Sequence, residues 1–312
     1  MKALVKQIIK NILHPVYRKY EALECQIEIN RVLSAKLLIN EIHKNDRTLE
    51  KLSDIEFKVF SQRGEDGIIQ YLISKVPIEN DTFVEFGVED YKESNTRFLL
   101  LNNDWQGLVM DCSEKNVNKI KESDIYWKYN LTAISAFITK DNINELIEKS
   151  GIKGDIGLLS VDVDGNDYWI WDAISVVSPR IVVCEYNSLF GCKDAVTIPY
   201  DSTFYRTKAH YSNLYYGSSL KALCILAKKK GYAFVGCNAA GSNAFFVRED
   251  VSGNLRTLDC ESGYVYSRAR ESRDRDGKLT FLSGNDRIKQ ISDMPVFDII
   301  TKENKKVSEI IN

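Results

Sequence analysis

Short apolar runs alternate with helix-like stretches from about residue 80 onward. Strands are expected at four buried runs and one weaker run, residues 83–87, 107–111, 156–163, 180–184 and 124–129. Between them, apolar residues recur every three or four positions, which predicts helices at 94–101, 114–121, 142–149 and 168–174. Because parallel strands need long crossover connections, this alternation indicates a parallel sheet with helices on both faces.

The end of this region has a different pattern. A helix is expected over residues 220–230, and Gly231 follows it in the position of a C-terminal cap. Two further strands, 232–237 and 243–248, flank a short turn and predict an antiparallel hairpin. The predicted fold class is therefore α/β, with five strand–helix units followed by a helix and a closing hairpin.

Residues 1–50 are expected to form a helical extension, because the apolar residues from Leu4 to Tyr20 follow a helical period. Residues 1–20 also carry five lysines or arginines and no acid. Such a helix suits an anionic membrane surface, and it equally suits packing on its own domain or on a second copy of the chain. We favour protein contact, with a homo-oligomer through these helices, because a second apolar series from Leu23 to Ile42 resembles the other arm of a helical hairpin.

Composition narrows the class of protein. The 312 residues predict the helical extension, a main domain over 51–250 and a C-terminal appendage over 251–312. The net charge of −2 gives no reason to expect nucleic acid as a partner. The seven cysteines are scattered without a CxxC pair, which favours a reducing cytoplasm over a disulfide scaffold or a zinc ribbon. No apolar run reaches the ~18 residues of a membrane span.

Acidic residues follow the expected strands. In an open parallel sheet, ligands bind outside the carboxyl ends of the strands, near the point where the strand order reverses. Asp111 ends the second strand, 24 residues after Gly87, where an acid can accept the hydroxyl hydrogens of a ribose; the alternative is a cap on the helix near Glu114. A full GxGxxG is absent, and an acidic turn repels pyrophosphate, so a nucleoside with a positive centre is favoured over NAD.

These features carry a family resemblance. The EFG at 85–87, Asp111 and the closing hairpin resemble class I S-adenosylmethionine-dependent methyltransferases, although 87–91 reads GVEDY where many such proteins have GxGxG. SQRGEDGII (61–69), FVEFGVEDYKESNTRFLL (83–100), WQGLVMD (105–111) and SVDVDGNDYW (160–169) resemble the FkbM-like members, often encoded in bacterial surface-polysaccharide gene clusters. The resemblance implies S-adenosylmethionine as cofactor. The residues it assigns to the cofactor site are Glu85, Gly87, Asn95, Asp111, Ser113, Asn130 and Asp162.

A second resemblance concerns metal. VDVDGNDY (161–168) and EYNSLF (185–190) are similar to segments of the divalent-metal-dependent O-methyltransferases. That similarity implies Asp162, Glu185 and Asn187 as ligands of Mg²⁺ or Mn²⁺, which prefer oxygen ligands. The alternative is that the acids after the fourth strand only bind backbone amides and cap the next helix.

The predicted reaction is O-methylation of a sugar hydroxyl on a surface polysaccharide or its precursor, in the cytoplasm or at the inner face of the membrane. His210 is the candidate base, because histidine titrates near neutral pH, and Asp162 and Asp164 are further candidates for catalysis. Glu65, Asp66 and Gln62 either border the cofactor or form a plain helix start. Two alternatives stay open: a non-catalytic module that binds a partner or glycan in a polysaccharide assembly complex, and an enzyme of sugar nucleotides.

Overall fold

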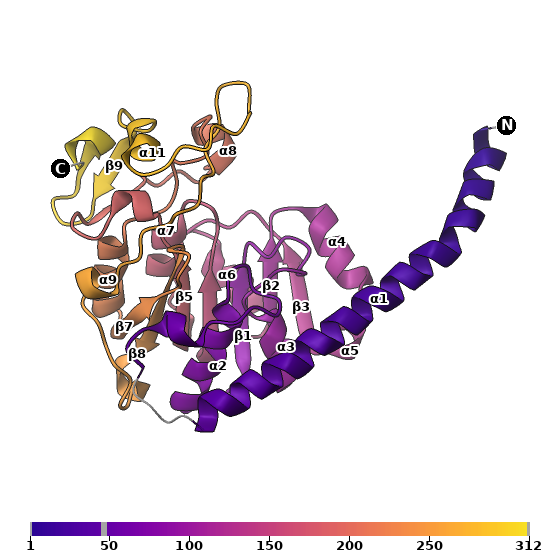
Figure 1. The fold of residues 1–312 in the computed structure, drawn as a ribbon. Coiled ribbons are helices and arrows are strands. Elements are labelled where there is room, and N and C mark those ends of the chain that lie inside the picture. The colour runs from indigo at the N-terminus through magenta and orange to yellow at the C-terminus, as the bar shows by residue number, and fades with distance from the viewer. Residues whose placement is uncertain (1, 45–48, 311–312) are drawn as a thin grey trace. The chain divides into compact units, whose positions relative to one another are not determined.

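The structure, a computed structural model, describes residues 2–44 and 49–310, and the chain divides into two compact units at residue 46. The first unit is one helix, α1 (Lys2–Lys44), drawn in indigo in Figure 1. The predicted helical hairpin is therefore wrong. Residues 16–44 contain neither glycine nor proline, so nothing in the sequence supplies the turn that a hairpin needs.

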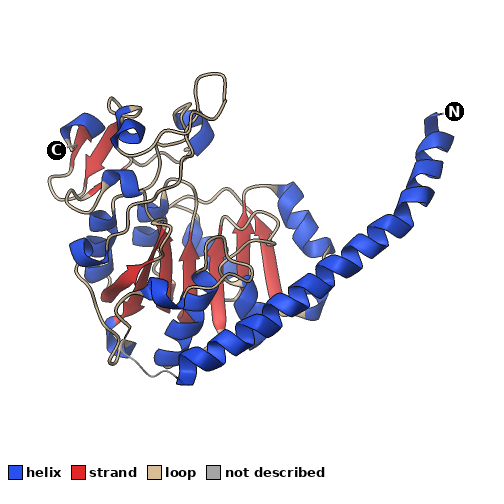
Figure 2. Cartoon of the chain, in the orientation of Figure 1, coloured by secondary structure: helices blue, strands red, loops and turns tan. Residues whose placement is uncertain are grey.

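The second unit is built on a seven-stranded sheet with the order β3-β2-β1-β4-β5-β8-β7 (Figures 1 and 2). All neighbouring strands are parallel except β8, which runs antiparallel to both β5 and β7. This confirms the predicted α/β class with its closing hairpin. The strands are β1 (Thr82–Phe86), β2 (Gln106–Asp111), β3 (Leu131–Ser135), β4 (Gly154–Val161), β5 (Val177–Glu185), β7 (Tyr232–Cys237) and β8 (Asn243–Arg248).

Helices cover both faces of this sheet, and every residue of β1 is buried. The larger core cluster joins alternate residues of the central strands to α6, α7 and α9, and Trp171 is its largest fully buried side chain. The helices are α2 (Glu65–Lys75), α3 (Arg97–Asn103), α4 (Glu114–Glu122), α5 (Asp124–Lys128), α6 (Ile143–Lys149), α7 (Asp167–Ala173), α8 (Arg206–Ala209), α9 (Leu220–Lys229), α10 (Cys260–Gly263) and α11 (Asn285–Lys289). In the described part of the chain, no helix combines the length and apolar character needed to cross a bilayer.

The third strand lies later than predicted. Residues 124–128 form α5 instead, with Trp127 73% exposed and Lys128 paired to Asp124 across one helical turn at 2.6 Å. The apolar residues of this segment are therefore a surface helix and not a buried strand. The strand is the alternating LTAIS sequence of β3, so Asn130 precedes the strand rather than following it.

A small second sheet has the order β10-β9-β6, formed by β6 (Val196–Thr197), β9 (Pro295–Asp298) and β10 (Glu303–Lys306). It has its own core, which includes Phe190, Ile198, Leu214, Ile291 and Val307. We call residues 188–219 with 285–310 the C-terminal lobe. Because β6 follows the carboxyl end of β5, the last part of the chain packs onto the connection that leaves the main sheet there.

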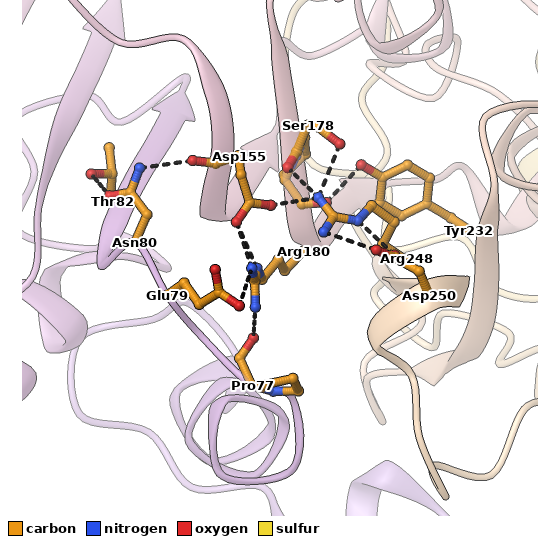
Figure 3. A network of polar contacts seen from close by, with 11 residues as sticks. Pro77, Glu79, Asn80, Thr82, Asp155, Ser178, Arg180, Tyr232, Arg248 and Asp250 are labelled. Atoms are coloured by element: carbon orange, nitrogen blue, oxygen red, sulfur yellow. Dashed lines mark hydrogen bonds and ion pairs between the residues drawn. The ribbon is translucent and has the colours of Figure 1, made fainter.

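At the amino edge of the main sheet, Asp155 of β4 joins two arginines (Figure 3). Arg180 of β5 donates from Nε to Asp155 Oδ2 at 2.8 Å, and Arg248 of β8 donates to Oδ1 at 2.6 Å. Arg180 also donates to the carbonyl of Pro77 and pairs with Glu79 at 3.2 Å, and its side chain is only 6% exposed. We call these residues the amino-edge clamp, because they tie β4, β5 and β8 together at the edge of the sheet opposite the acid-containing turns after β4 and β5.

Candidate functional site

The strand order reverses between β1 and β4, and the turns after these two strands touch. Gly87 follows β1 with φ 70°, and a Cβ atom there would lie 2.0 Å from the carbonyl oxygen of Asp162. Glycine is therefore required at position 87 so that the two turns can pack against each other. The contact places the turn after β1 directly beside Asp162 at the carboxyl edge of the sheet.

Asp111, at the end of β2, is 7% exposed and tied to the backbone by both carboxylate oxygens. Oδ2 accepts from the Glu89 amide at 2.9 Å, and Oδ1 accepts from the Ser113 amide at 2.8 Å. Asp111 does not cap α4, since the N-cap is Ser113, whose hydroxyl accepts from the Asn116 amide. Because a carboxylate has about four acceptor sites, Asp111 keeps two for a ligand.

Glu85, by contrast, is used by the protein itself. Its carboxylate accepts from the Ser94 hydroxyl at 2.6 Å, from the Asn95 amide at 2.8 Å, and from the Thr96 amide and hydroxyl at 3.0 and 2.5 Å. Three of these bonds go to Oε2 and one goes to Oε1, so Oε1 keeps one acceptor site. Glu85 therefore shapes the start of α3, and its predicted role at the cofactor stays a prediction. Asn95 is placed by the same turn and donates from its side chain to Ser160 Oγ at 3.0 Å.

Three acids converge at the ends of β4 and β5. Asp162, Asp164 and Glu185 each offer a carboxylate oxygen within 4.8 Å of the other two. Glu185 is 9% exposed, and its Oε2 atom is buried without a hydrogen-bond partner. Burial and mutual repulsion raise the pKa of Asp162 and of Glu185 well above their ordinary values. The cluster is therefore suited to bind a cation, and its all-oxygen donor set fits Mg²⁺ or Mn²⁺.

Arg206 of α8 brings one positive charge to this acid cluster. Its Nη1 donates to Asp164 Oδ1 at 2.7 Å, its Nε donates to the Asn213 carbonyl at 3.0 Å, and its guanidinium lies 3.7 Å from the Tyr216 ring centroid. One cation beside three carboxylates leaves the cluster short of positive charge. The sequence analysis did not identify Arg206 as a site residue. The several acids after the strands could have indicated it, because clustered carboxylates need a basic side chain nearby.

Asn187, the third predicted metal ligand, is held by bonds to the backbone, and its role as a ligand stays a prediction. Its side-chain amide donates to the carbonyls of Leu214 and Tyr216, each at 3.0 Å, and its Oδ1 accepts from the Leu189 amide at 3.0 Å. These bonds fasten the C-terminal lobe to β5. Asp164 brings the third carboxylate to the acid cluster.

Asp167 binds backbone amides, as the alternative interpretation of the acids after the fourth strand expects. Its Oδ1 accepts from the Val163 amide at 2.7 Å, and its Oδ2 accepts from the Gly165 amide at 3.0 Å. Asp167 therefore folds the turn after β4 around its own carboxylate. That leaves Asp162 and Asp164 as the acids of this turn that face Glu185.

Asn130 cannot reach the adenine position predicted for it. It lies at the amino end of β3 and donates to the side chain of Gln106, the first residue of β2. Both residues are at the edge of the sheet opposite the acid cluster. The error follows from the misplaced third strand. Asn130 was expected after that strand, at the carboxyl edge of the sheet, but it lies before the strand, at the amino edge.

His210 lies in the C-terminal lobe. Its Nδ1 is 2.7 Å from the Ser212 hydroxyl, and its ring is 4.3 Å from that of Tyr211. Burial, together with the positive charge of Arg275, lowers the pKa of His210, so the ring is neutral at pH 7 and able to accept a proton. Its role as the base stays a prediction.

The residues before β1 are structural. Glu65 accepts from the side chains of Asn238 and Asn243 at 2.7 and 3.0 Å, which ties α2 to the closing hairpin. Asp66 Oδ2 accepts from the amides of residues 59–61 at 2.7–2.8 Å and from the Ser61 hydroxyl at 2.8 Å. These contacts favour the plain helix start over the cofactor edge for both acids.

Substituting Asp66 with asparagine tests this assignment through pH. Burial raises the pKa of Asp66 from 3.8 to about 6, so the folded state holds a proton that the unfolded state releases. Wild-type stability should therefore fall as pH rises from about 4 to about 6. Asp66→Asn keeps a carbonyl acceptor and removes the titration, so its stability relative to wild type should improve over that range by about 2–3 kcal/mol. Urea unfolding at each pH measures the difference; a difference independent of pH would contradict the assignment.

No protein-family model and no curated protein matches the chain. Among solved structures, it is similar to the N-terminal domain of EvdMO1 with SAH bound, at 8% identity over 68% of this chain and 94% of that one, with a TM-score of 0.40. An S-adenosylmethionine-dependent methyltransferase from Clostridium acetobutylicum is 10% identical over 69% and 97% of the two chains, with a TM-score of 0.38.

PKMT2 from Rickettsia typhi in complex with AdoHcy is 10% identical to this chain over 64% of it and 55% of that protein, with a TM-score of 0.42. Of these three structures, one is described as an S-adenosylmethionine-dependent methyltransferase, and the other two contain SAH or AdoHcy. The fold of the chain is defined by its own strand order, 3-2-1-4-5-8-7 with only β8 antiparallel.

Proposed function

We propose that this chain is an S-adenosylmethionine-dependent O-methyltransferase whose acceptor is a sugar hydroxyl of a surface polysaccharide or its precursor. The observation that carries the proposal is the acid cluster at the carboxyl edge, where a buried oxygen of Glu185 has no partner beside Asp162 and Asp164. Such a site calls for a positive group. The sugar acceptor rests on the resemblance of residues 61–69, 83–100, 105–111 and 160–169 to FkbM-like methyltransferases.

The residues present fit such a cofactor. Asp111 retains two acceptor sites for ribose hydroxyls, and the turn after β1 lies against the turn after β4. Glu89 and Tyr91 stand where many relatives have glycine, yet both adopt the left-handed conformation that glycine would, with φ 47° and 62°. Both positions therefore have a backbone conformation that glycine readily adopts, which supports the proposal.

When bound, S-adenosylmethionine supplies an electrophilic methyl group. Asp111 holds the nucleoside end, and the acid cluster holds Mg²⁺ or Mn²⁺ and orients the acceptor hydroxyl. His210, neutral at pH 7, is the residue proposed to take the hydroxyl proton. Aligning the reactants in this way can lower the barrier by roughly 7 kcal/mol in favourable cases.

A non-catalytic binding module is the second candidate. It is favoured by Tyr91, which is 1% exposed and bonded through its hydroxyl to Thr96 at 2.9 Å, so a bulky ring fills the turn in place of a glycine. Such a module would bind a glycan or a partner protein and would not turn over S-adenosylmethionine. The experiment below separates the two, because only the enzyme needs the nucleoside site.

Calorimetric titration with S-adenosylhomocysteine tests the proposed cofactor site. Asp111→Asn should weaken binding about 10- to 100-fold, because it removes the charge and one acceptor of a charge-assisted contact worth about 1.5–3 kcal/mol. Asp124→Asn is the matched control, since Asp124 lies on the surface helix α5 and forms an exposed ion pair with Lys128 at 2.6 Å. No binding by a folded wild-type protein, or equal binding by both variants, would contradict the proposal.

A further inference from the structure

One face of α1 carries a row of exposed apolar side chains. Eight large apolar residues of this helix are exposed in the described part of the chain: Val16, Tyr20, Leu23, Ile27, Ile29, Leu33, Leu37 and Leu38. Exposure reaches 57% at Leu23 and 72% at Leu37. Single exposed apolar residues are ordinary, whereas a continuous row along one helix face indicates an interaction surface.

The spacing of this row is that of a coiled coil. Steps of four and three residues connect Val16, Tyr20, Leu23, Ile27, Asn30, Ser34 and Leu37, which are alternating d and a positions of a heptad repeat. In the sequence the same steps continue backward to Leu13 and Ile9. Leu33 and Leu38 fall on the flanking g and e positions, so seven of the eight exposed residues share one seam and only Ile29, at a c position, lies off it. We propose that this seam, residues 16–38, pairs with the same seam of a second copy as a parallel, in-register coiled coil.

The polar residues within the seam set the orientation. In the parallel arrangement Asn30 faces Asn30 of the second copy and Ser34 faces Ser34, so each amide or hydroxyl meets a group with which it can hydrogen-bond. An antiparallel pairing centred near the middle of residues 16–38 would place Asn30 against Tyr20 and Ser34 against Val16, or Asn30 against Ile27 and Ser34 against Leu23. Buried polar groups without partners are costly, so the antiparallel alternative is disfavoured.

Charges beside the seam agree with this orientation. In a parallel coiled coil a g residue faces the e residue five positions later in the other helix. That rule pairs Lys19 of one copy with Glu24 of the other, and two-fold symmetry forms this attractive pair twice. The same rule pairs Leu33 with Leu38, which extends the apolar core of the coiled coil. Pro15 and Cys25 fall on the outward c and f positions, where they leave the pairing undisturbed.

Sedimentation equilibrium and light scattering on the full chain test the pairing. Wild type should have twice the monomer mass of 35.7 kDa at low micromolar concentration. The double variant Leu23→Glu, Ile27→Glu should be monomeric, with a dissociation constant raised at least 100-fold. Ile29→Glu is the matched control, because it changes an equally exposed apolar residue of the same helix outside the seam, and it should leave the dimer intact.

Cysteine cross-linking tests the orientation. In a Cys25→Ser background, Val16→Cys and Leu37→Cys should each form a disulfide-linked dimer, because d residues face their own copies in a parallel, in-register pair. Failure of both to cross-link in a dimeric protein would overturn the orientation. A monomeric wild type would overturn the proposal outright. Flotation of that monomer with vesicles of phosphatidylcholine and phosphatidylglycerol would then indicate a membrane-binding helix. A monomer that stays in solution would indicate a seam folded onto its own chain.

Discussion

Replacing Glu185 with glutamine is expected to remove methyl transfer while leaving the protein at least as stable as wild type. Glu185 brings a third carboxylate next to Asp162 and Asp164, with one oxygen buried and unpartnered. Glutamine has the same shape, cannot carry the negative charge, and relieves the repulsion within the cluster. We therefore expect turnover to fall about 100-fold or more, as for loss of a preorganised electrostatic group, and the free energy of unfolding to rise by about 1 kcal/mol.

The measurements are Mn²⁺ binding by electron paramagnetic resonance, methyl transfer from labelled S-adenosylmethionine to a panel of sugar acceptors, and thermal unfolding. The matched control is Asp172→Asn, which removes an acid from a surface ion pair with Lys229 at 2.8 Å. That variant should bind Mn²⁺ and turn over as wild type does. If Glu185→Gln keeps both Mn²⁺ binding and turnover, the acid cluster is not the reaction centre.

The largest loss of stability is expected for Asp155→Ala in the amino-edge clamp. Arg180 is 6% exposed, and its Nε and Nη2 both contact Asp155 Oδ2, at 2.8 and 2.7 Å. Without Asp155 the buried guanidinium keeps only the exposed Glu79 and the Pro77 carbonyl as partners. Breaking a buried ion pair from one side costs about 3–5 kcal/mol, and we expect a loss of about 3 kcal/mol because those partners remain.

Urea unfolding measures this loss, and two further variants define its origin. Asp250→Ala removes an acid that is 63% exposed and contacts Arg248 alone among the clamp arginines, so its cost should stay below about 1 kcal/mol. Adding Arg180→Met to Asp155→Ala should recover most of the stability, since no uncompensated charge then remains. Equal losses for Asp155→Ala and Asp250→Ala would show that burial of Arg180 does not decide the effect.

Sequence patterns were sufficient for most of the sheet because buried strands are apolar on both faces and leave long, unambiguous runs. The predicted strands at 232–237 and 243–248 match β7 and β8 residue for residue. The pattern failed at 124–129, where a short run containing Tyr126 and Trp127 has strand-like composition but lies in a surface helix. Apolar composition alone does not say whether a short run is covered, and that depends on the rest of the fold.

The site was predictable only in part for a similar reason. Position at a strand end correctly brought Asp162 and Glu185 together, since neighbouring parallel strands end at one edge. Position alone did not indicate which carboxylates would accept hydrogen bonds from backbone amides. Asp167 stands among these acids in the sequence, yet two backbone amides occupy its carboxylate in the structure. That choice is made by turn geometry, which a linear pattern does not contain.

The turn after β1 has a consequence for the entropy of ligand binding. A glycine-rich turn samples many conformations and must lose that freedom when it closes on a ligand. Here every residue from Val88 to Thr96 carries a β-carbon, while Asp111 and Glu85 hold the two ends of the segment. Its ordering therefore occurs when the chain folds. A ligand that docks against this turn meets a rigid surface, and less of its interaction energy is spent on ordering the protein.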